Sequence, residues 1–292
     1  MTDSAQETER SPPVPSAGAP ADGHATLRLI TFNTAVGNPR IKTEQPDFLE
    51  LPFYREIVEG RPEAPLLAAQ EVGPQQARAL KRAAAEGRFC LIHIQRPGQG
   101  NALLIPDRFR VLAARSRYYL ASQLKALAKA LWRPAIKRER FNHRQFFELR
   151  MWSQVRLHDR SAELAFTIFN THLSGDPHLR LAQATALFQR VHRARRQGPV
   201  VLAGDLNVRA AEVGKPGHAG PDEAVRALFA PLRDMAAGAV DARRSNIDYV
   251  LATGFSPVSS RLYTDDALQL PGLPSAELIS DHYAKEAVVR FE

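Results

Sequence analysis

Short apolar runs that end at polar residues are the dominant pattern along the chain. Residues 26–33, TLRLITFN, alternate apolar and polar side chains as a half-buried strand does. Residues 199–207, PVVLAGDLN, begin with branched apolar side chains and continue into Asp205 and Asn207. Runs of the same kind predict further strands at 64–72, 88–94, 101–106, 151–159, 163–173, 246–252 and 283–291.

Two longer segments have the pattern of helices. Residues 74–87, PQQARALKRAAAEG, begin with Pro, carry Ala and Leu at helical spacing and end at Gly87. Residues 177–198, PHLRLAQATALFQRVHRARRQG, have the same arrangement and end at Gly198. Because many strands are separated by only a few helices, the pattern predicts an α/β (α+β) chain with two packed sheets and helices outside them.

The N-terminal segment departs from this pattern. Residues 1–25 are rich in Pro, Ser, Ala and Gly and contain almost no large apolar side chain. Such a segment cannot offset the entropy lost on ordering. We therefore expect a disordered tail at 1–25, followed by one domain at 26–292.

A basic insertion, residues 118–150, carries most of the excess positive charge. Between Lys125 and Arg150 there are eight Lys or Arg residues and two Glu. Leucines recur there at helical spacing beside a basic row (Leu120, Leu124, Leu127, Leu131; Lys125, Lys129, Arg133), and Pro134 ends the run. Two interpretations stay open: a core-packed helix with a solvated basic face, or a basic arm for phosphate backbones or anionic membrane surfaces.

Composition narrows the class of protein. The chain has 292 residues, of which 44% are hydrophobic, and this is enough for a large core. No run of about 18 apolar residues is present, which predicts no membrane span, and the N-terminus lacks a signal-peptide pattern, which predicts a cytoplasmic protein. Cys90 is the single cysteine and stands in an apolar run, so we expect it in the core and expect no disulfide. The net charge of +8 favours polyanionic partners.

Polar residues suited to metal binding and acid–base chemistry stand at six strand ends. They are Asn33, Glu71, His172, Asp205 with Asn207, Asp248, and Asp281 with His282. One acid after a strand is usually a turn or capping residue, but six such places need a shared explanation. Carboxylate and amide oxygens suit Mg²⁺ or Mn²⁺, and histidines transfer protons or stabilise phosphate oxygens. The set indicates metal-assisted hydrolysis of a phosphate ester.

The order of short motifs carries a family resemblance. Between residues 27 and 291 the chain contains, in this order, TFN, QE, GNALL, NTHL, GDLN, IDYVL and SDH. This ordered set resembles the endonuclease/exonuclease/phosphatase superfamily, which includes deoxyribonuclease I and the neutral sphingomyelinases. The resemblance implies a four-layered α/β sandwich, in which two mixed sheets face each other with helices outside. It also implies a Mg²⁺- or Mn²⁺-dependent phosphoric ester hydrolase.

The resemblance implies a role for each matched residue. It implies a metal site made of Asn33, Glu71, Asp205 and Asp281, with Glu71 as the principal ligand. It implies catalytic roles for His172, Asp205, Asn207, Asp248 and His282.

Within the catalytic set, each matched residue resembles a different part of the family's machinery. Asp205 resembles the carboxylate that activates the attacking water, and Asn207 resembles the amide that orients the water or the phosphate. His282 resembles the histidine beside the scissile phosphate, and Asp248 resembles the acid that supports it.

His172 and Asn101 complete the expected site. His172 matches the branches of the superfamily that use two histidines, such as deoxyribonuclease I. The acid that supports this histidine in deoxyribonuclease I has no counterpart in the segment HIQRPGQGN, residues 93–101. Asn101 resembles a substrate-binding position near the phosphate, although a residue after Gly100 also fits a simple turn.

The leaving group does not follow from these motifs. Our first hypothesis is a monomeric nuclease-type phosphodiesterase, with nucleic acid as the phosphate-ester substrate. The alternative is a phospholipid or inositol-phosphate phosphoesterase that meets an anionic lipid headgroup. A remote alternative is a polyanion-binding module without turnover, against which the complete set of acids and histidines argues.

Overall fold

The structure is a computed structural model that describes most of the chain. The described residues are 26–35, 51–59, 64–96, 99–120, 124, 149–208, 219–240, 246–269, 280 and 282–292. The predicted tail at 1–25, the charged part of the basic insertion at 125–148 and Asp281 lie outside these residues.

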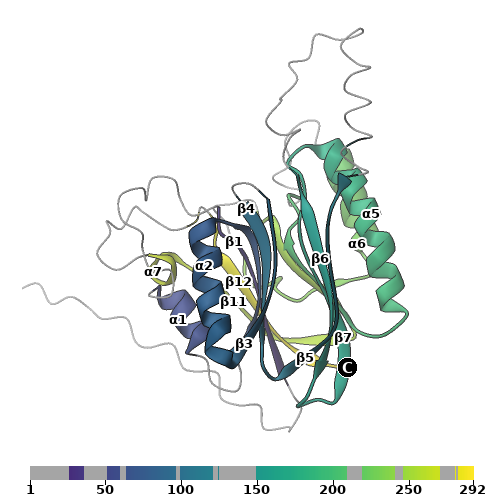
Figure 1. The fold of residues 1–292 in the computed structure, drawn as a ribbon. Helices are drawn as coiled ribbons and strands as arrows, with labels where there is room; N and C mark the ends of the chain where they lie inside the picture. Colours follow the sequence, from purple (N-terminus) through teal and green to yellow (C-terminus); the bar gives the residue numbers. More distant parts are fainter. Residues whose placement is uncertain are drawn as a thin grey trace, which may run out of the picture.

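Two six-stranded sheets form the centre of the molecule (Figure 1). The first has the order β11-β12-β1-β2-β4-β3, which is Phe255–Tyr263, Ala284–Phe291, Thr26–Asn33, Leu66–Val72, Gln99–Pro106 and Phe89–Arg96. The second has the order β5-β6-β7-β8-β10-β9, which is Phe109–Tyr118, Met151–Asp159, Leu164–His172, Val200–Asp205, Asp248–Thr253 and Arg233–Asp234. Each sheet contains one parallel pair, β1–β2 or β7–β8, and its other described pairs are antiparallel.

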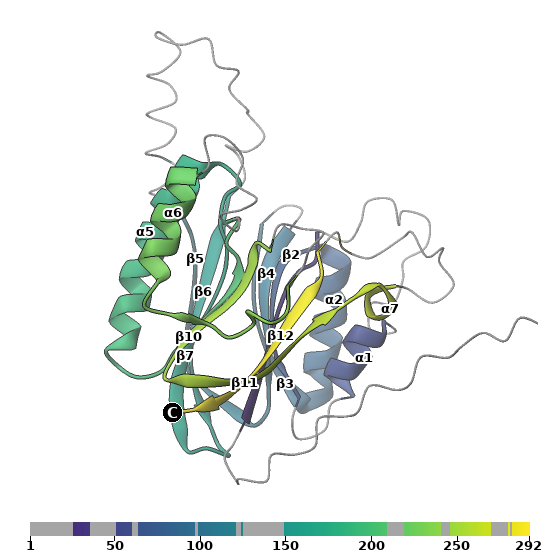
Figure 2. The same cartoon turned by 180° about the vertical axis from the view of Figure 1, so that it is seen from behind.

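Helices cover the outer face of each sheet, as the views from both sides show (Figures 1 and 2). The first sheet is covered by α1, α2 and α7, which are Pro52–Val58, Pro74–Ala83 and Asp265–Leu268. The second is covered by α5 and α6, which are Pro177–Arg195 and Ala219–Phe229. A single π-helical turn, Ala84–Arg88, extends α2. No described helix has both the length and the apolar character needed to cross a bilayer.

Three apolar clusters hold the four layers together. The central cluster lies between the sheets and includes Leu29, Phe166 and Val250. The other two lie between a sheet and its helices, around Phe53 on one side and Leu187 on the other. The four-layered α/β sandwich expected from the sequence is therefore confirmed. The sequence pattern missed the edge strands β5 and β11, because their solvent-facing sides carry no clear apolar alternation.

The expected core position of Cys90 is wrong. Cys90 lies on β3, which is the last strand of the first sheet, and its side chain is exposed. An apolar run can form an edge strand as well as a central one, so the run alone did not locate the thiol.

A buried pair of amides joins the two sheets. Gln70 of β2 donates from Nε2 to Oδ1 of Asn170 on β7 over 2.8 Å. Asn170 in turn donates from Nδ2 to the carbonyl oxygens of Ala69 (3.0 Å) and Ala102 (2.8 Å). The register between β2 and β4 slips between Ala69 and Val72, at the point where these carbonyls turn toward Asn170. Both amide side chains are completely buried, so this bridge satisfies polar groups that no water reaches.

We predict that Asn170→Ala lowers the free energy of unfolding by about 2–4 kcal/mol. The substitution leaves the buried carbonyls of Ala69 and Ala102 without the Asn170 donor, and Nε2 of Gln70 keeps only its bond to Ala68. Each orphaned group costs about 1–3 kcal/mol. Urea titration followed by circular dichroism measures the loss. Gln154→Ala, which removes a half-buried amide from β6, is the matched control and should change stability by less than about 0.5 kcal/mol. Equal losses in the two variants would contradict a special role for the bridge.

Candidate active site

The site lies where the two parallel pairs end. In the register, Asn33 of β1 stands beside Gln70 of β2, and Glu71 follows immediately. In the second sheet, His172 of β7 stands directly beside Asp205 of β8. Since parallel strands finish at the same edge, this topology brings together side chains that are far apart in the sequence.

Residues with a left-handed backbone mark these strand ends. Ala35, Glu71, Asn207 and Asn246 have φ values between 47° and 52°, a region that residues other than Gly seldom adopt. Each follows or precedes a strand that supplies the site. For Glu71 the positive φ accompanies the slipped register between β2 and β4. Strain of this kind persists when surrounding contacts enforce it, and it is concentrated at functional sites.

Gly204 allows β7 and β8 to meet closely just before the site. Its φ is +143°, and a Cβ at this position would overlap the carbonyl oxygen of Thr171. In the motif GD, Gly204 is therefore needed for the close approach of the two strands, and Asp205 supplies a carboxylate to the site.

Asp205 is the most enclosed carboxylate of the site and is held at both oxygens. Its Oδ2 accepts a hydrogen bond from Nδ2 of Asn33 over 2.9 Å. Its Oδ1 accepts one from the backbone N–H of Asn207 over 2.8 Å. The Asn207 side chain donates from Nδ2 to the carbonyl of Leu173 over 2.9 Å, so it ties the end of β8 to the loop after β7.

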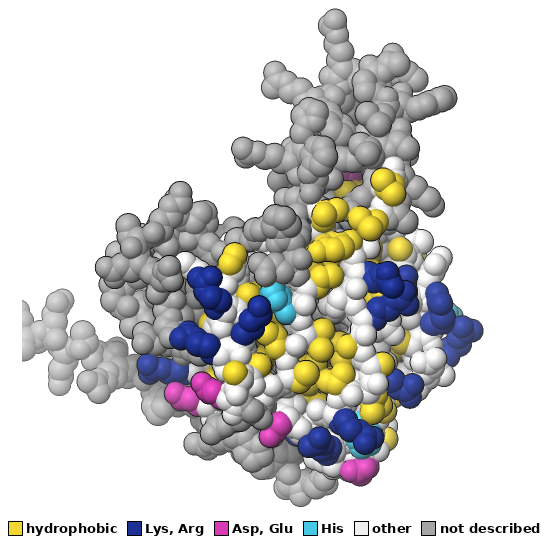
Figure 3. All heavy atoms as spheres, viewed as in Figure 1, with side chains coloured by type: hydrophobic (Ala, Val, Ile, Leu, Met, Phe, Trp, Pro, Cys, Tyr) yellow, Lys and Arg dark blue, Asp and Glu magenta, His cyan; other side chains and the backbone are white. Residues whose placement is uncertain are grey.

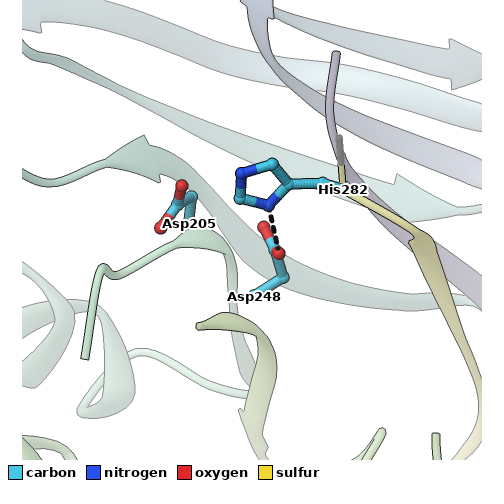
Figure 4. A group of neighbouring side chains, drawn as sticks. All are labelled: Asp205, Asp248 and His282. Carbon is cyan, nitrogen blue, oxygen red and sulfur yellow. Dashed lines mark hydrogen bonds and ion pairs between the residues drawn. The ribbon is translucent and has the colours of Figure 1, made fainter. Parts of the chain in front are cut away.

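His282 and Asp248 form a buried hydrogen-bonded pair opposite Asp205 (Figure 4). Nδ1 of His282 lies 2.8 Å from Oδ2 of Asp248. Figure 4 shows the imidazole between the two carboxylates, with its second nitrogen on the side of Asp205. The Asp248 carboxylate favours a proton on Nδ1 and stabilises the charged ring. The backbone N–H of His282 donates to Oγ of Ser280, whose hydroxyl donates to the carbonyl of Asn33.

Burial and a like charge change the acidity of Asp205. Burial raises its pKa, the charge of Asp248 raises it further, and the resulting pKa is about 7. His282, Asn33 and the N–H of Asn207 act in the opposite direction. Two buried carboxylates that share one histidine therefore favour a bound cation or a retained proton.

A second group of charged side chains lies on the other side of Asp205. Nε2 of His172 is 3.4 Å from Oδ2 of Asp205, and Nδ1 of His172 is 3.4 Å from Oε1 of Glu71. Nη1 of Arg150 lies at the edge of the same ring, 2.6 Å from Nδ1 and 2.8 Å from Nε2. It is also 3.4 Å from Oε1 of Glu71. His172 thus links Glu71 of the first sheet to Asp205 of the second.

A narrow pocket of about 10 Å³, with room for about one water molecule, opens beside this group. Glu71, Asn101, Arg150 and His172 line it, together with Gln99, Gly100, Leu149 and Met151. Asn101 is buried and donates from Nδ2 to the carbonyl of Met151 over 3.2 Å. Its amide is thus part of the pocket wall and also fixes β4 to the start of β6.

Two buried side chains of α5 fix the loop that follows His172. Oε1 of Gln183 accepts from the backbone N–H of Ser174 over 2.8 Å. Arg180 donates from Nη1 to the carbonyls of Ser174 (3.2 Å) and Gly175 (3.0 Å), and its Nη2 pairs with Asp222 of α6. Because this loop also accepts the side chain of Asn207, α5 and α6 stabilise the site from outside.

All the described residues expected from the sequence meet at this edge. Asn33, Glu71, His172, Asp205, Asn207, Asp248 and His282 are linked by the contacts above, and Asn101 lines the adjoining pocket. Asp281 lies outside the described residues. Sequence reasoning missed Arg150, which was counted only as part of the basic insertion. Its position directly before the predicted strand 151–159 was the one available signal.

Comparison with known proteins agrees with this arrangement. A sequence model of the endonuclease/exonuclease/phosphatase family matches residues 30–282. The chain belongs to this family. The matched residues run from β1 to His282 and therefore include every described part of the site. A search of curated proteins found no match.

Solved structures of the endonuclease/exonuclease/phosphatase family have the same fold. One from Bacteroides vulgatus gives a TM-score of 0.62 at 17% identity, covering 92% of this chain and 100% of the other. D. rerio TDP2, complexed with a single-strand DNA product, gives 0.61 at 14% identity, with coverage of 91% and 99%. The human Nocturnin catalytic domain with bound sulfate anion gives 0.62 at 16% identity, with coverage of 91% and 94%. At these identities the similarity concerns the fold.

The donor set fits a hard divalent cation. One carboxylate oxygen of Asp205, one of Asp248 and one ring nitrogen of His282 lie within 4.8 Å of one another. Oδ1 of Asp248 is buried and has no hydrogen-bond donor among the described residues. Glu71 and Asn33 offer further oxygens on the other side of Asp205, and Oδ1 of Asn33 already accepts from the N–H of Ala35. Oxygen-rich sets of this kind suit Mg²⁺ or Mn²⁺.

We predict that Gly204→Ala destabilises the fold by about 2–4 kcal/mol and lowers activity. The new Cβ forces β8 away from Thr171 and moves Asp205 with it. Thermal unfolding and urea titration give the stability change. Gly220→Ala is the control, because nothing lies within 4 Å of a Cβ at that position in α6. A Gly204→Ala protein as stable as the Gly220→Ala protein would refute the close approach of β7 and β8.

Proposed function

We propose that the protein is a Mg²⁺- or Mn²⁺-dependent phosphodiesterase that cleaves nucleic acid. The observation that carries the proposal is the buried Asp248–His282 pair facing Asp205, with Glu71, His172 and Arg150 on the other side. Family membership supports hydrolysis of a phosphate ester, since the endonuclease/exonuclease/phosphatase family covers nucleases and phosphatases. The TDP2 structure with a DNA product supports a nucleic-acid substrate.

A bound divalent cation, held by Glu71 and Asp205 with Asn33 beside them, would polarise the phosphoryl group and lower the pKa of bound water. In this proposal Glu71 is the principal ligand. Its carboxylate is partly exposed toward the pocket, and its ion pairs with described residues are long, 3.4 Å to Arg150 and 3.4 Å to His172. A carboxylate placed in this way retains oxygen lone pairs for a cation.

Asp205 is the proposed base for the attacking water. Without a metal ion, burial and Asp248 raise its pKa to about 7. A cation bound beside Asp205 would lower this pKa and keep the carboxylate ionised, ready to accept a proton. The hydrogen bonds from Asn33 and Asn207 hold both carboxylate oxygens in place. The amide of Asn207 is held by its bond to the carbonyl of Leu173, and in this proposal it orients that water.

His282 is the proposed acid–base group next to the scissile phosphate. Asp248 holds Nδ1, so the second nitrogen is turned toward the reacting centre near Asp205. In its charged form the ring donates a hydrogen bond to a phosphate oxygen and stabilises the charge that develops there. Asp248 thus acts through His282 as a positioning residue.

Arg150 and His172 are the proposed anchors for the substrate phosphate. Both line the small pocket beside Glu71, and Arg150 is nearly buried there. A guanidinium keeps its charge at all relevant pH values and donates several N–H groups in one plane, which matches phosphate oxygens. Asn101 forms the wall of this pocket and limits the orientation of the phosphate.

The test of the proposal is turnover of bis-p-nitrophenyl phosphate with Mg²⁺ or Mn²⁺, run beside DNA, RNA, phospholipid and phosphoinositide substrates. We expect hydrolysis of the small diester and of nucleic acid, and loss of both in EDTA. If the protein hydrolysed phospholipid or phosphoinositide and not nucleic acid, the proposed substrate would be wrong. The proposed metal-dependent hydrolysis of a phosphate ester would still hold. Full activity in EDTA would refute the metal requirement.

Glu71→Gln should lower turnover by at least about 10²-fold and weaken the activation by Mg²⁺, because a hard cation loses a charged oxygen. The dependence of activity on Mg²⁺ concentration measures the second effect. Glu86→Gln, an exposed carboxylate on the turn after α2, is the control and should leave the Mg²⁺ dependence unchanged. If the two variants gave the same curve, Glu71 would not be the principal ligand.

Asp205→Asn should lower turnover by about 10²–10⁴-fold, because the amide keeps the shape and loses the charge that accepts the proton. The free energy of unfolding should not fall, since the substitution removes a buried charge that Asp248 repels. Steady-state kinetics and urea titration measure the two effects separately. A folded Asp205→Asn protein with normal turnover would exclude the proposed base.

A further inference from the structure

The outer edge of the second sheet carries arginines that the proposed chemistry does not use. Arg115 and Arg117 lie on β5, and Arg190 and Arg193 lie on α5. Arg190 is half-buried, and the other three side chains are exposed. We call these four residues the arginine patch. Figure 3 shows Lys and Arg side chains gathered over β6 and α5 at the right of the view, and a second group over α2 at the left.

The patch is organised around one indole. The guanidinium of Arg190 stacks on the ring of Trp152, 4.4 Å from its centre. Trp152 of β6 is paired with Arg117 of β5 in the sheet register, so both side chains leave the same face of the sheet. The side chains of β5 and α5 therefore converge above one buried tryptophan.

The charges of the patch repel one another. Burial lowers the pKa of Arg190, and the charges of Arg115, Arg193 and Arg117 lower it further. None of the four makes a salt bridge to a carboxylate within the described part of the chain. This repulsion costs stability unless an anion offsets it.

The local sequence supplies no compensating acid. Residues 177–198, which contain α5, have five Arg and no Asp or Glu. β5, Phe109–Tyr118, has three Arg and likewise no acid. On a surface whose charges serve only solubility, positive and negative side chains are usually mixed. In a helix, opposite charges three or four residues apart also add stability. An all-arginine face is instead typical of a surface that binds a polyanion.

The patch lies close to the active site along the strands. Trp152 of β6 is paired with Thr171 of β7, which directly precedes His172. Thr171 also bonds to the hydroxyl of Tyr119, the residue that follows β5, over 2.7 Å. Arg150, which lines the phosphate pocket, stands two residues before Trp152. A small phosphodiester bound at the strand ends would not extend to the outer face of the sheet, whereas a long chain of phosphates could pass over the strand ends and reach the patch.

We propose that the arginine patch binds the phosphate backbone of a nucleic-acid strand whose scissile phosphodiester occupies the active site. This inference rests on the proposed function and deepens it, because it makes a polymer the substrate class. The guanidinium groups bind backbone oxygens and stack on bases, and both contacts repeat along a strand. An anionic membrane is the competing occupant, and the test separates it.

The experiment compares two triple variants of the full chain. The patch variant is Arg115→Gln, Arg117→Gln and Arg193→Gln, which leaves Arg190 on its tryptophan. The control variant is Arg55→Gln, Arg78→Gln and Lys81→Gln, three exposed residues of α1 and α2 on the other side of the molecule. Both variants lose three positive charges. A difference in their affinity for nucleic acid therefore depends on where the charges lie and not on the net charge.

Binding of a fluorescein-labelled oligonucleotide is measured by anisotropy in EDTA, over a range of salt concentrations. For the patch variant we expect affinity at about 0.1 M salt to fall by about tenfold or more, and the salt dependence to flatten by about 0.7–0.9 per lost phosphate contact. The control variant should bind as the unmodified protein does. A patch variant with Lys in place of the three Arg should retain most of the salt dependence, because counterion release depends on charge.

Four results test the proposal. Equal affinity of the patch and control variants for the oligonucleotide overturns the proposal. Loss of binding only to vesicles that contain phosphatidylserine overturns it in favour of a membrane surface. Turnover of bis-p-nitrophenyl phosphate should be unchanged in both variants, and a lower kcat in the patch variant would show that the patch acts on the chemistry and not on the polymer. If the unmodified protein hydrolyses no diester with any divalent cation, the proposed function fails, while the binding data still decide whether the patch holds nucleic acid.

Discussion

The distance between the two sheets is fixed by the buried amide bridge between Gln70 and Asn170. The bridge lies one residue before Glu71 on β2 and two residues before His172 on β7. Apolar packing alone allows neighbouring sheets to slide, because it has no preferred direction. Hydrogen bonds between buried amides do have a preferred direction. A one-residue slip of a strand would leave the amides unpaired and would turn every following side chain to the other face of the sheet. The 3.4 Å contact between Glu71 and His172 depends on this bridge.

The bridge also explains why the site tolerates strain. Glu71 adopts a left-handed backbone directly after Gln70, and Asn207 does so after Asp205. Such residues cost of order 1–3 kcal/mol each when nothing enforces them. At Glu71 the amides of Gln70 and Asn170 hold the preceding backbone, and at Asn207 the carboxylate of Asp205 and the carbonyl of Leu173 hold the residue itself. Contacts in the sandwich core thus stabilise the left-handed backbone at Glu71 and Asn207. This backbone points their side chains in directions that a regular strand does not allow.

The sequence predicted the central strands and the strand-end residues well, because both depend on local pattern. Strands such as Val200–Asp205 are buried on both faces and read as continuous apolar runs. Their terminal polar residues stand out for the same reason. Arg150 could not be found in this way, since its position beside His172 depends on β6 pairing with β7 and not on its neighbours in the sequence. The exposed position of Cys90 depends on β3 lying at the sheet edge, which is also a matter of strand order.

The distribution of charge in the molecule relates the active site to the arginine patch. The centre of the site contains Asp205, Asp248 and Glu71, and buried carboxylates repel the phosphate on which they are proposed to act. A divalent cation bound there would remove that repulsion at the scissile group. It cannot attract the remaining phosphates of a polymer, which lie beyond the range of a bound ion in salt solution. In the proposed arrangement, arginines at the edge of the same sheet provide that attraction without entering the chemistry. The arginine patch and the acidic site can therefore lie on one sheet, because the two signs of charge are separated between the outer face of this sheet and its strand ends.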